Sequence, residues 1–301
     1  MRGKLSILSA ATLLWVCNDA AAIDDGPRGY QLVPEGTNAI TVIGLFQEGN
    51  QSFGPGTALS GADIDIDIGL VQYTRSFNIA GNLGALFVVL PAGKVSGTLH
   101  TAVGDLEGES SGIGDLIVGG VVGLYGSPAL PKAEWAAYDP GLSIGLLGKV
   151  YAPTGAFSGD KIINLGADRW VGQIGLPMSY YFGTSMLDPE LATLELVPSV
   201  TFFSDSGDTS QDPILTLEGH ATRNLGSRFW ASLDGLYVYG GETSTNGISN
   251  GDTQESFALG GTLGVNVTPS FSIKFSYGEF VYHNTDGLDG RSFRVVSNFV
   301  F

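Results

Sequence analysis

The feature that most constrains this chain is the alternation of apolar residues with small or polar ones. Between Ser256 and Val267, apolar side chains stand at Phe257, Leu259 and Leu263, and small or polar ones fill the intervening positions. A period of two places the apolar set on one face of an extended strand, whereas a helix would distribute it around its axis. About twelve such segments recur along the chain, so the sequence predicts an all-β protein.

The spacing of these segments narrows the prediction. Their cores lie near residues 38–48, 62–77, 83–91, 114–126, 141–152, 170–183, 192–204, 213–223, 228–240, 256–267, 270–283 and 291–301. Connectors broadly alternate between tight ones, such as 78–82 and 224–227, and long ones, such as 92–113 and 153–169, although 127–140 is long where a tight turn is expected. This alternation is typical of barrels with short periplasmic turns and long outer loops. We therefore predict a transmembrane antiparallel up-and-down β-barrel of about 12 strands, of the bacterial outer-membrane type.

Two prolines conflict with plain strands. Pro177 and Pro198 fall inside the sixth and seventh segments, and proline cannot donate a ladder hydrogen bond in a barrel that has no free edges. We expect either a bulge or a broken strand at these positions.

The first residues have the features of a secretory signal. Arg2 and Lys4 precede an apolar run over 5–16, and small alanines follow at 20–22. The run is too short for a membrane helix, which needs about 20 apolar residues. We expect a signal peptide over 1–22, a short periplasmic or plug segment over 23–37, and the barrel over 38–301.

Charge and cysteine content exclude several classes of partner. The formal net charge of -16 repels phosphate backbones, so no nucleic acid partner is expected, and it disfavours anionic substrates in general. The one cysteine, Cys17, lies in the predicted signal peptide, which leaves the mature chain without disulfides or zinc-thiolate sites.

The chain ends on Phe301, preceded at two-residue spacing by Phe299. This ending is similar to the C-terminal signature of bacterial outer-membrane proteins, which the barrel-assembly machinery reads. The expected location is the outer membrane, with its lipid and the assembly machinery as partners. The plain alternative is the last half-buried strand of a secreted sandwich.

Short motifs in the middle of the chain resemble a known family. They are Lys149–Phe157, Asn164–Trp170, the Gly112–Asp115 turn and Leu196–Pro198. These residues look like the phenol meta-pathway degradation family, whose members are outer-membrane barrels described as transporters. The resemblance implies a barrel and the passage of apolar molecules, and it does not imply that this chain degrades phenol.

The alternation also predicts which side chains face the lumen. If Ile64, Ile66 and Ile68 face lipid, the intervening aspartates face inward or rim the outer mouth, because a charge on the lipid face is costly. The polar lumen candidates on this basis are Asp63, Asp65, Asp67, Glu195, Glu218, His220, Asp234 and Lys274. A calcium loop is disfavoured, because Ile68 stands where such a loop needs glycine.

Segments three to five are apolar on both faces. The inward candidates among them are Phe87, Val89, Ile117, Val121 and Leu147. They predict either an apolar inner wall suited to an apolar solute, or a wall covered by an inward loop or by residues 23–37.

Catalytic patterns are sparse. None of His100, His220 and His283 has the spacing of a metal pair, and the one notable pairing, Glu218 with His220, is more typical of a hydrogen bond in a lumen. We expect no enzyme activity, no cofactor and no metal. The favoured function is a channel for passive uptake of small apolar or aromatic compounds. The alternatives are a structural or adhesive outer-membrane barrel and a soluble secreted β-sandwich that binds a ligand.

Overall fold

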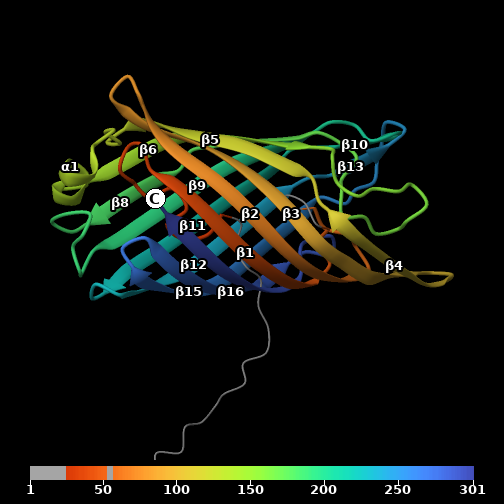
Figure 1. Cartoon of the computed structure of the whole chain (residues 1–301). Coiled ribbons are helices and arrows are strands. Elements are labelled where there is room, and N and C mark those ends of the chain that lie inside the picture. The colour runs from red at the N-terminus through yellow and green to blue at the C-terminus, as the bar shows by residue number, and fades with distance from the viewer. Residues whose placement is uncertain (1–24, 53–56) are drawn as a thin grey trace, which may run out of the picture.

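The protein folds into one closed antiparallel barrel. The structure, a computed structural model, describes residues 25–52 and 57–301, so the predicted signal peptide lies outside the described residues. The sheet closes because β1 (Asn38–Gly49) pairs antiparallel with β2 (Ala62–Ile79) on one side and with β17 (Gly290–Val300) on the other. The predicted all-β barrel is confirmed, and no second stacked sheet is needed to close it (Figure 1).

Neighbouring barrel strands follow the chain order. The remaining ones are β3 (Asn82–Thr101), β5 (Leu116–Tyr125), β6 (Leu142–Ala152), β7 (Val171–Gly175), β8 (Met178–Phe182), β9 (Ala192–Phe203), β11 (Ile214–Leu225), β12 (Phe229–Gly240), β15 (Gln254–Thr268) and β16 (Phe271–His283). β7 and β8 both pair with β6 and β9 and together form one barrel strand. The barrel therefore has 12 strands, as the periodicity predicts.

The two prolines interrupt the hydrogen-bond ladder without shifting its register. The carbonyl of Pro177 accepts from Gly145 N at 2.8 Å, and that of Pro198 accepts from Leu176 N at 2.9 Å. The carbonyl of each proline accepts a hydrogen bond, but proline has no backbone N–H with which to donate one to the neighbouring strand. The register of β6 with β7 continues unchanged into β8. The strand formed by β7 and β8 therefore lacks ladder hydrogen bonds at Pro177 but contains no bulge.

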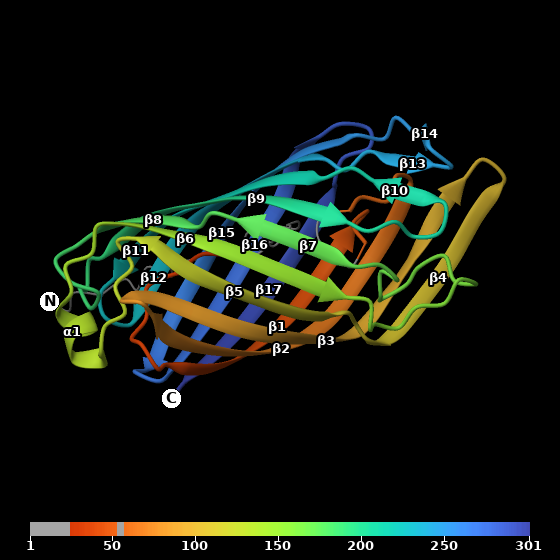
Figure 2. The same cartoon turned by 90° about the horizontal axis from the view of Figure 1, so that it is seen from above.

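The two ends of the barrel differ. At one end the turns are tight: Ala80 and Gly81, both at positive φ, connect β2 to β3. At this end the long connector predicted at 127–140 contains the single short helix α1 (Lys132–Ala137). At the other end β4 (Gly104–Ile113) pairs with β3 in a hairpin that projects beyond the barrel (Figure 2). Three short strands, β10 (Thr209–Gln211), β13 (Thr243–Thr245) and β14 (Ile248–Ser249), form a small sheet there.

An apolar belt surrounds the outside of the barrel. Ile40, Val42 and Phe46 on β1 are exposed, as are Leu86 and Val88 on β3, at alternate positions along each strand. An apolar surface of this extent marks contact with a membrane, which excludes the soluble sandwich. The protein is a barrel of the bacterial outer-membrane type. In the described part of the chain no helix is long and apolar enough to cross a membrane.

The inward and outward faces of β2 are the opposite of those predicted, which corrects one prediction. Ile64, Ile66 and Ile68 are only 2–3% exposed and pack inside the barrel against Ile163 and Leu165 of the β6–β7 connector. Asp63, Asp65 and Asp67 are exposed on the outer face and do not line the lumen. The physical reason is the position of the aspartates along the barrel axis. Outward side chains are apolar at Val71 and Tyr73, which lie in the membrane belt. The aspartates lie beyond that belt, where the outer face of the barrel contacts water.

Candidate channel lumen

Three adjacent strands carry an acidic patch inside the barrel. Glu195 on β9, Glu218 on β11 and Asp234 on β12 are buried, and register places His220 directly between Glu195 and Asp234. His220 Nδ1 lies 2.8 Å from Asp234 Oδ1, and Nε2 lies 3.0 Å from Glu218 Oε1. An imidazole that bonds a carboxylate through each nitrogen donates twice, which is the protonated form. The two hydrogen bonds fix the imidazole between carboxylates of the barrel wall.

Hydroxyl groups bond two further oxygens of this patch. Thr262 donates to Asp234 Oδ2 at 2.7 Å, and Thr193 donates to Glu195 Oε1 at 2.6 Å. Buried carboxylates persist only when their lone pairs are used in this way. The patch is therefore a fixed part of the wall.

Basic side chains lie on both sides of the acidic patch. Lys149 projects from β6, whereas Lys274 and Arg294 project from β16 and β17. The side chain of Lys149 is 4% exposed. The lumen thus has an acidic wall between two basic ones at the same level, and it can bind charges of both signs.

The N-terminal segment, residues 25–37, enters the barrel and binds these walls. Asp25 accepts from Lys149 Nζ at 2.7 Å and 2.6 Å through its two oxygens, and Tyr30 donates a further bond to it. Gly26 N donates to Glu218 Oε1 at 2.7 Å. The carbonyl of Pro27 accepts from Lys274 Nζ at 3.0 Å. Each of the three walls therefore contacts a different part of the segment.

A tight turn shapes the segment for these contacts. Gly29 N donates to Gly26 O at 3.1 Å, and Arg28 occupies the third position of the turn with φ 61°. That position normally takes glycine because other side chains are strained there. Arg28 is held in place because its backbone N donates to Glu195 Oε2 at 2.8 Å.

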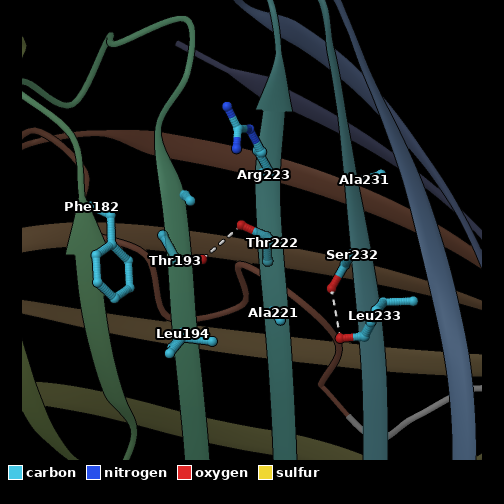
Figure 3. Close-up of a pocket in the computed structure, with 10 residues that line it drawn as sticks. Phe182, Thr193, Leu194, Ala221, Thr222, Arg223, Ala231, Ser232 and Leu233 are labelled. Carbon is cyan, nitrogen blue, oxygen red and sulfur yellow. Dashed lines mark hydrogen bonds between the residues drawn. The ribbon is translucent and has the colours of Figure 1, made fainter.

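The side chain of Arg28 is bound as well. Its guanidinium lies 4.3 Å from the centre of the Trp230 ring and donates to Thr222 Oγ1 at 3.1 Å and 3.0 Å. Thr222 in turn lies 2.7 Å from Thr193 Oγ1, a contact drawn between β11 and β9 in Figure 3. A cation over an indole face is among the stronger non-covalent contacts of a single side chain.

Further along, the segment packs against the end of the barrel that has tight turns. Leu32 N donates to Tyr181 OH at 3.1 Å, and Trp135 of α1 donates to Leu32 O at 3.0 Å. Leu32 is buried together with Leu83, Tyr181, Met186 and Leu191. The long connector with α1 thus provides a seat for the segment, which gives a structural reason for its length.

The charge state of Asp25 strengthens its contact. Burial by itself would raise the pKa of Asp25, but the ammonium of Lys149 and the hydrogen bonds from Lys149 and Tyr30 outweigh burial, so the pKa lies below its ordinary value. Asp25 is therefore ionised at neutral pH. The ion pair is a charge-assisted bidentate contact of the stronger kind.

Buried apolar clusters occupy the outer half of the barrel interior. One cluster includes Ile214, Val238 and Phe280 and lies on β11, β12, β15 and β16. The other is the cluster on β2 and β3 described above. In the order of strands around the barrel, β17 and β1 separate the two clusters. The structure places the five predicted apolar residues on inward positions. Val89 and Leu147 are buried, and Phe87, Ile117 and Val121 are half-buried.

Sequence reasoning singled out some of the residues at the level of the segment and missed Lys149, Arg294, Asp25 and Arg28. Lys149 and Arg294 share the inward phase of their strands with Leu147 and Val296, so alternation alone could have identified them. Asp25 and Arg28 precede the first strand, where no periodicity indicates what they contact. Among Glu195, Glu218, His220, Asp234 and Lys274, the structure brings all five to the level at which the segment binds.

One surface hollow lies on the outside of the barrel and is not part of the lumen. Ala192, Ala221 and Ala231 line it together with Phe182, Leu194 and Leu233, most of which are labelled in Figure 3. Leu194 and Leu233 are exposed, which is the lipid-facing phase of β9 and β12. Small residues at adjacent positions make the hollow, and lipid chains would fill it. Within residues 25–52 and 57–301, no group of three or more His, Cys, Asp or Glu side chains is arranged to hold a metal ion.

Comparison with solved structures places the fold among outer-membrane barrels. The COG4313 outer membrane channel from Pseudomonas putida F1 superposes with a TM-score of 0.71 at 19% identity, over 93% of this chain and 100% of that one. The β domain of the Bordetella autotransporter BrkA has a TM-score of 0.48 at 12% identity, over 89% of this chain and 100% of that one. The CymD monoaromatic hydrocarbon channel has a TM-score of 0.41 at 9% identity, over 89% of this chain and 88% of that one.

No curated protein matches the chain significantly. The sequence profile of one family matches residues 47–295, which is most of the chain and nearly the whole barrel. The protein therefore belongs to the family described as "Putative MetA-pathway of phenol degradation".

Proposed function

We propose that the protein is an outer-membrane channel for passive uptake of small apolar or aromatic compounds. The observation that carries the proposal is the outer half of the barrel interior, where aliphatic side chains of the two clusters face inward. A water-filled pore is lined by polar residues, and an apolar lining favours apolar solutes. The P. putida protein with the same fold is described as an outer membrane channel, which supports the proposal.

The N-terminal segment has to move for a solute to pass. It fills the lumen at the level of the charged walls, yet it makes no strand pairing and is held by side chains and single hydrogen bonds. Such contacts open far more easily than a barrel wall in which every strand is paired. We propose that the segment leaves while the barrel stays closed.

Uptake by intact cells tests this function. A lipopolysaccharide-covered outer membrane is a poor path for naphthalene, so cells that produce the protein should accumulate radiolabelled naphthalene faster than cells without it. Cells that produce a chain lacking residues 25–34 should accumulate it faster still. Rates equal to those of cells without the protein, with both chains assembled, would contradict a channel function.

A structural or adhesive role is the second candidate. It is favoured by the β3–β4 hairpin, which projects from the barrel and exposes Asp105, Glu107 and Glu109. Removal of residues 96–109 distinguishes the two roles. If the protein is a channel, cells should keep their naphthalene uptake rate without the hairpin. If it is an adhesive barrel, cells should lose attachment, and their uptake rate should equal that of cells without the protein.

A further inference from the structure

The ion pair inside the lumen joins a fixed group to a detachable one. Lys149 belongs to β6, which is hydrogen-bonded on both sides in the barrel wall. Asp25 belongs to the N-terminal segment, which is not part of the sheet. The wall therefore holds a buried ammonium whose carboxylate partner is carried by a segment that can leave.

The side-chain amide of Gln173, beside Lys149, has one atom without a hydrogen-bond partner. Gln173 on β7 stands directly opposite Lys149 in the ladder, so the two side chains leave the wall about 5 Å apart on the same face. Gln173 is 3% exposed, its amide nitrogen donates to Ser199 Oγ at 3.2 Å, and its Oε1 has no hydrogen-bond partner among the described residues. A buried acceptor without a donor is costly, and it indicates a place for a donor from a ligand.

We propose that Lys149 and Gln173 form a binding site for small aromatic carboxylates, in which the carboxylate takes the place of the Asp25 side chain. This inference rests on the proposed channel function and deepens it by naming a substrate class. A hydroxylated aromatic acid fits best, because its carboxylate pairs with Lys149 and a ring hydroxyl donates to Gln173 Oε1. The ring lies against Leu147 and Val171, the buried apolar neighbours of Lys149 and Gln173 on the inward face.

The segment itself presents the same pair of groups. Asp25 and Tyr30 place a carboxylate and a phenol in contact, and the carboxylate bonds Lys149. Exchange of one carboxylate for another keeps the bidentate ion pair of the ammonium, whereas loss of Asp25 without replacement takes a carboxylate away from a buried charge, which is costly. A neutral aromatic solute offers no such exchange. The site thus selects for a negative charge and couples binding to release of the segment.

The acidic net charge of the chain does not oppose this site. Exposed carboxylates such as Asp63, Asp65 and Asp67 lie on the outer face, beyond the membrane belt. Solvent and salt screen such charges over about 10 Å. Inside the barrel the local positive partners of a carboxylate at this position are Lys149 from β6 and Arg294 from the second basic wall, on β17.

Equilibrium dialysis with radiolabelled benzoate and 4-hydroxybenzoate tests the proposal on the detergent-solubilised protein. In Asp25→Asn the competing carboxylate is gone, so benzoate should bind about tenfold tighter than in the unchanged protein. Adding Lys149→Met to Asp25→Asn should abolish binding. Adding Lys94→Met instead is the matched control: this lysine lies exposed on the outer face and pairs with Glu109 at 2.8 Å, so binding should persist.

A second measurement does not depend on the Lys149 variant. Gln173→Leu in the Asp25→Asn chain should weaken 4-hydroxybenzoate several-fold and leave benzoate unchanged. Heat-modifiable migration on gels verifies that each variant is a folded barrel. Equal benzoate affinity with and without Lys149→Met, or no gain from Asp25→Asn, would overturn the proposal. Naphthalene uptake by cells reports the channel function separately, because a neutral solute does not use Lys149, so failure of one proposal is distinguishable from failure of the other.

Discussion

Asp25 in the N-terminal segment and Lys149 in β6 are 124 residues apart in the chain and form an ion pair of 2.6 Å inside the barrel. The pair joins the segment that fills the lumen to the wall that surrounds it. The neighbouring contacts of the segment are backbone hydrogen bonds to Glu218 and Glu195 and the stacking of Arg28 on Trp230. Retention of the segment should therefore depend strongly on the charge of Asp25.

Removing that charge should release the segment. In Asp25→Asn the charge-assisted bonds to Lys149 become neutral ones, and we expect a loss of about 1–3 kcal/mol in retention of the segment. Trypsin cleaves after Arg28 only when the segment leaves the lumen, so cleavage should accelerate at least about fivefold, as 1.4 kcal/mol is a factor of about ten. Mass spectrometry of the released peptide measures the rate.

Glu35→Gln is the matched control for this variant. Glu35 lies in the same segment, and its carboxylate bonds the exposed side chain of Asn78 at 3.0 Å. Its removal should leave the cleavage rate unchanged. Equal acceleration in both variants would mean that general loosening, and not the ion pair, exposes Arg28.

Acid should release the segment in the unchanged protein. The pKa of Asp25 is lower in the folded protein than its ordinary value of 3.8, so its contribution to retention is fully present above that value and is lost as the pH falls through the folded pKa. The charged and titratable groups facing Asp25 are Lys149 from β6, Tyr30 from the segment and Arg294 from β17. Conductance measured from pH 7 down to pH 3 should rise only at the acidic end. Asp25→Asn should remove that rise, and a rise centred near neutral pH would point to a different group.

The inward position of Ile66 on β2 leads to a stability prediction. Ile66 is 2% exposed and packs in the inner apolar cluster, so Ile66→Asp places an unpaired carboxylate there and should destabilise the barrel by at least about 3 kcal/mol. Asp65→Ala on the outer face should change little. Urea unfolding in detergent measures the free energy of unfolding of both variants. A larger loss in Asp65→Ala than in Ile66→Asp would show that the aspartates face the lumen.

Two histidines test the role of burial. His220 and His100 each contact two carboxylates, His100 through Asp63 and Asp105 at 3.0 Å and 2.8 Å, but the side chain of His100 is 50% exposed and that of His220 only 1%. His220→Leu removes the cation that Glu218 and Asp234 share, which leaves two buried negative charges bonded only by neutral donors, and it should cost about 3–5 kcal/mol. His100→Leu should leave the free energy of unfolding nearly unchanged, because water replaces its bonds. Similar losses in the two variants would show that His220 is more hydrated than its burial indicates.

The fold was predictable because a period of two persists through every barrel strand, including the one interrupted at Pro177. The side on which a residue lies was less predictable. Alternation separates Asp65 from Ile66 but does not say which of them faces out, and the answer depends on the height of β2 above the membrane. The sequence predicts a long connector over 92–113, where the structure has the β3–β4 hairpin, because glycines and charged residues outside the bilayer remove the apolar alternation. The contacts of Asp25 and Arg28 join residues more than 100 positions apart, which no local pattern encodes.

The central claim is that the barrel encloses a passage and that the N-terminal segment fills it. Single-channel recording in planar bilayers measures this most directly, with the unchanged protein compared with a chain lacking residues 25–34. We expect conductance to rise several-fold on removal of the segment, with barrel stability in the urea assay largely retained. Equal conductance of the two folded chains would contradict the claim, because the lumen would then be closed by the wall itself.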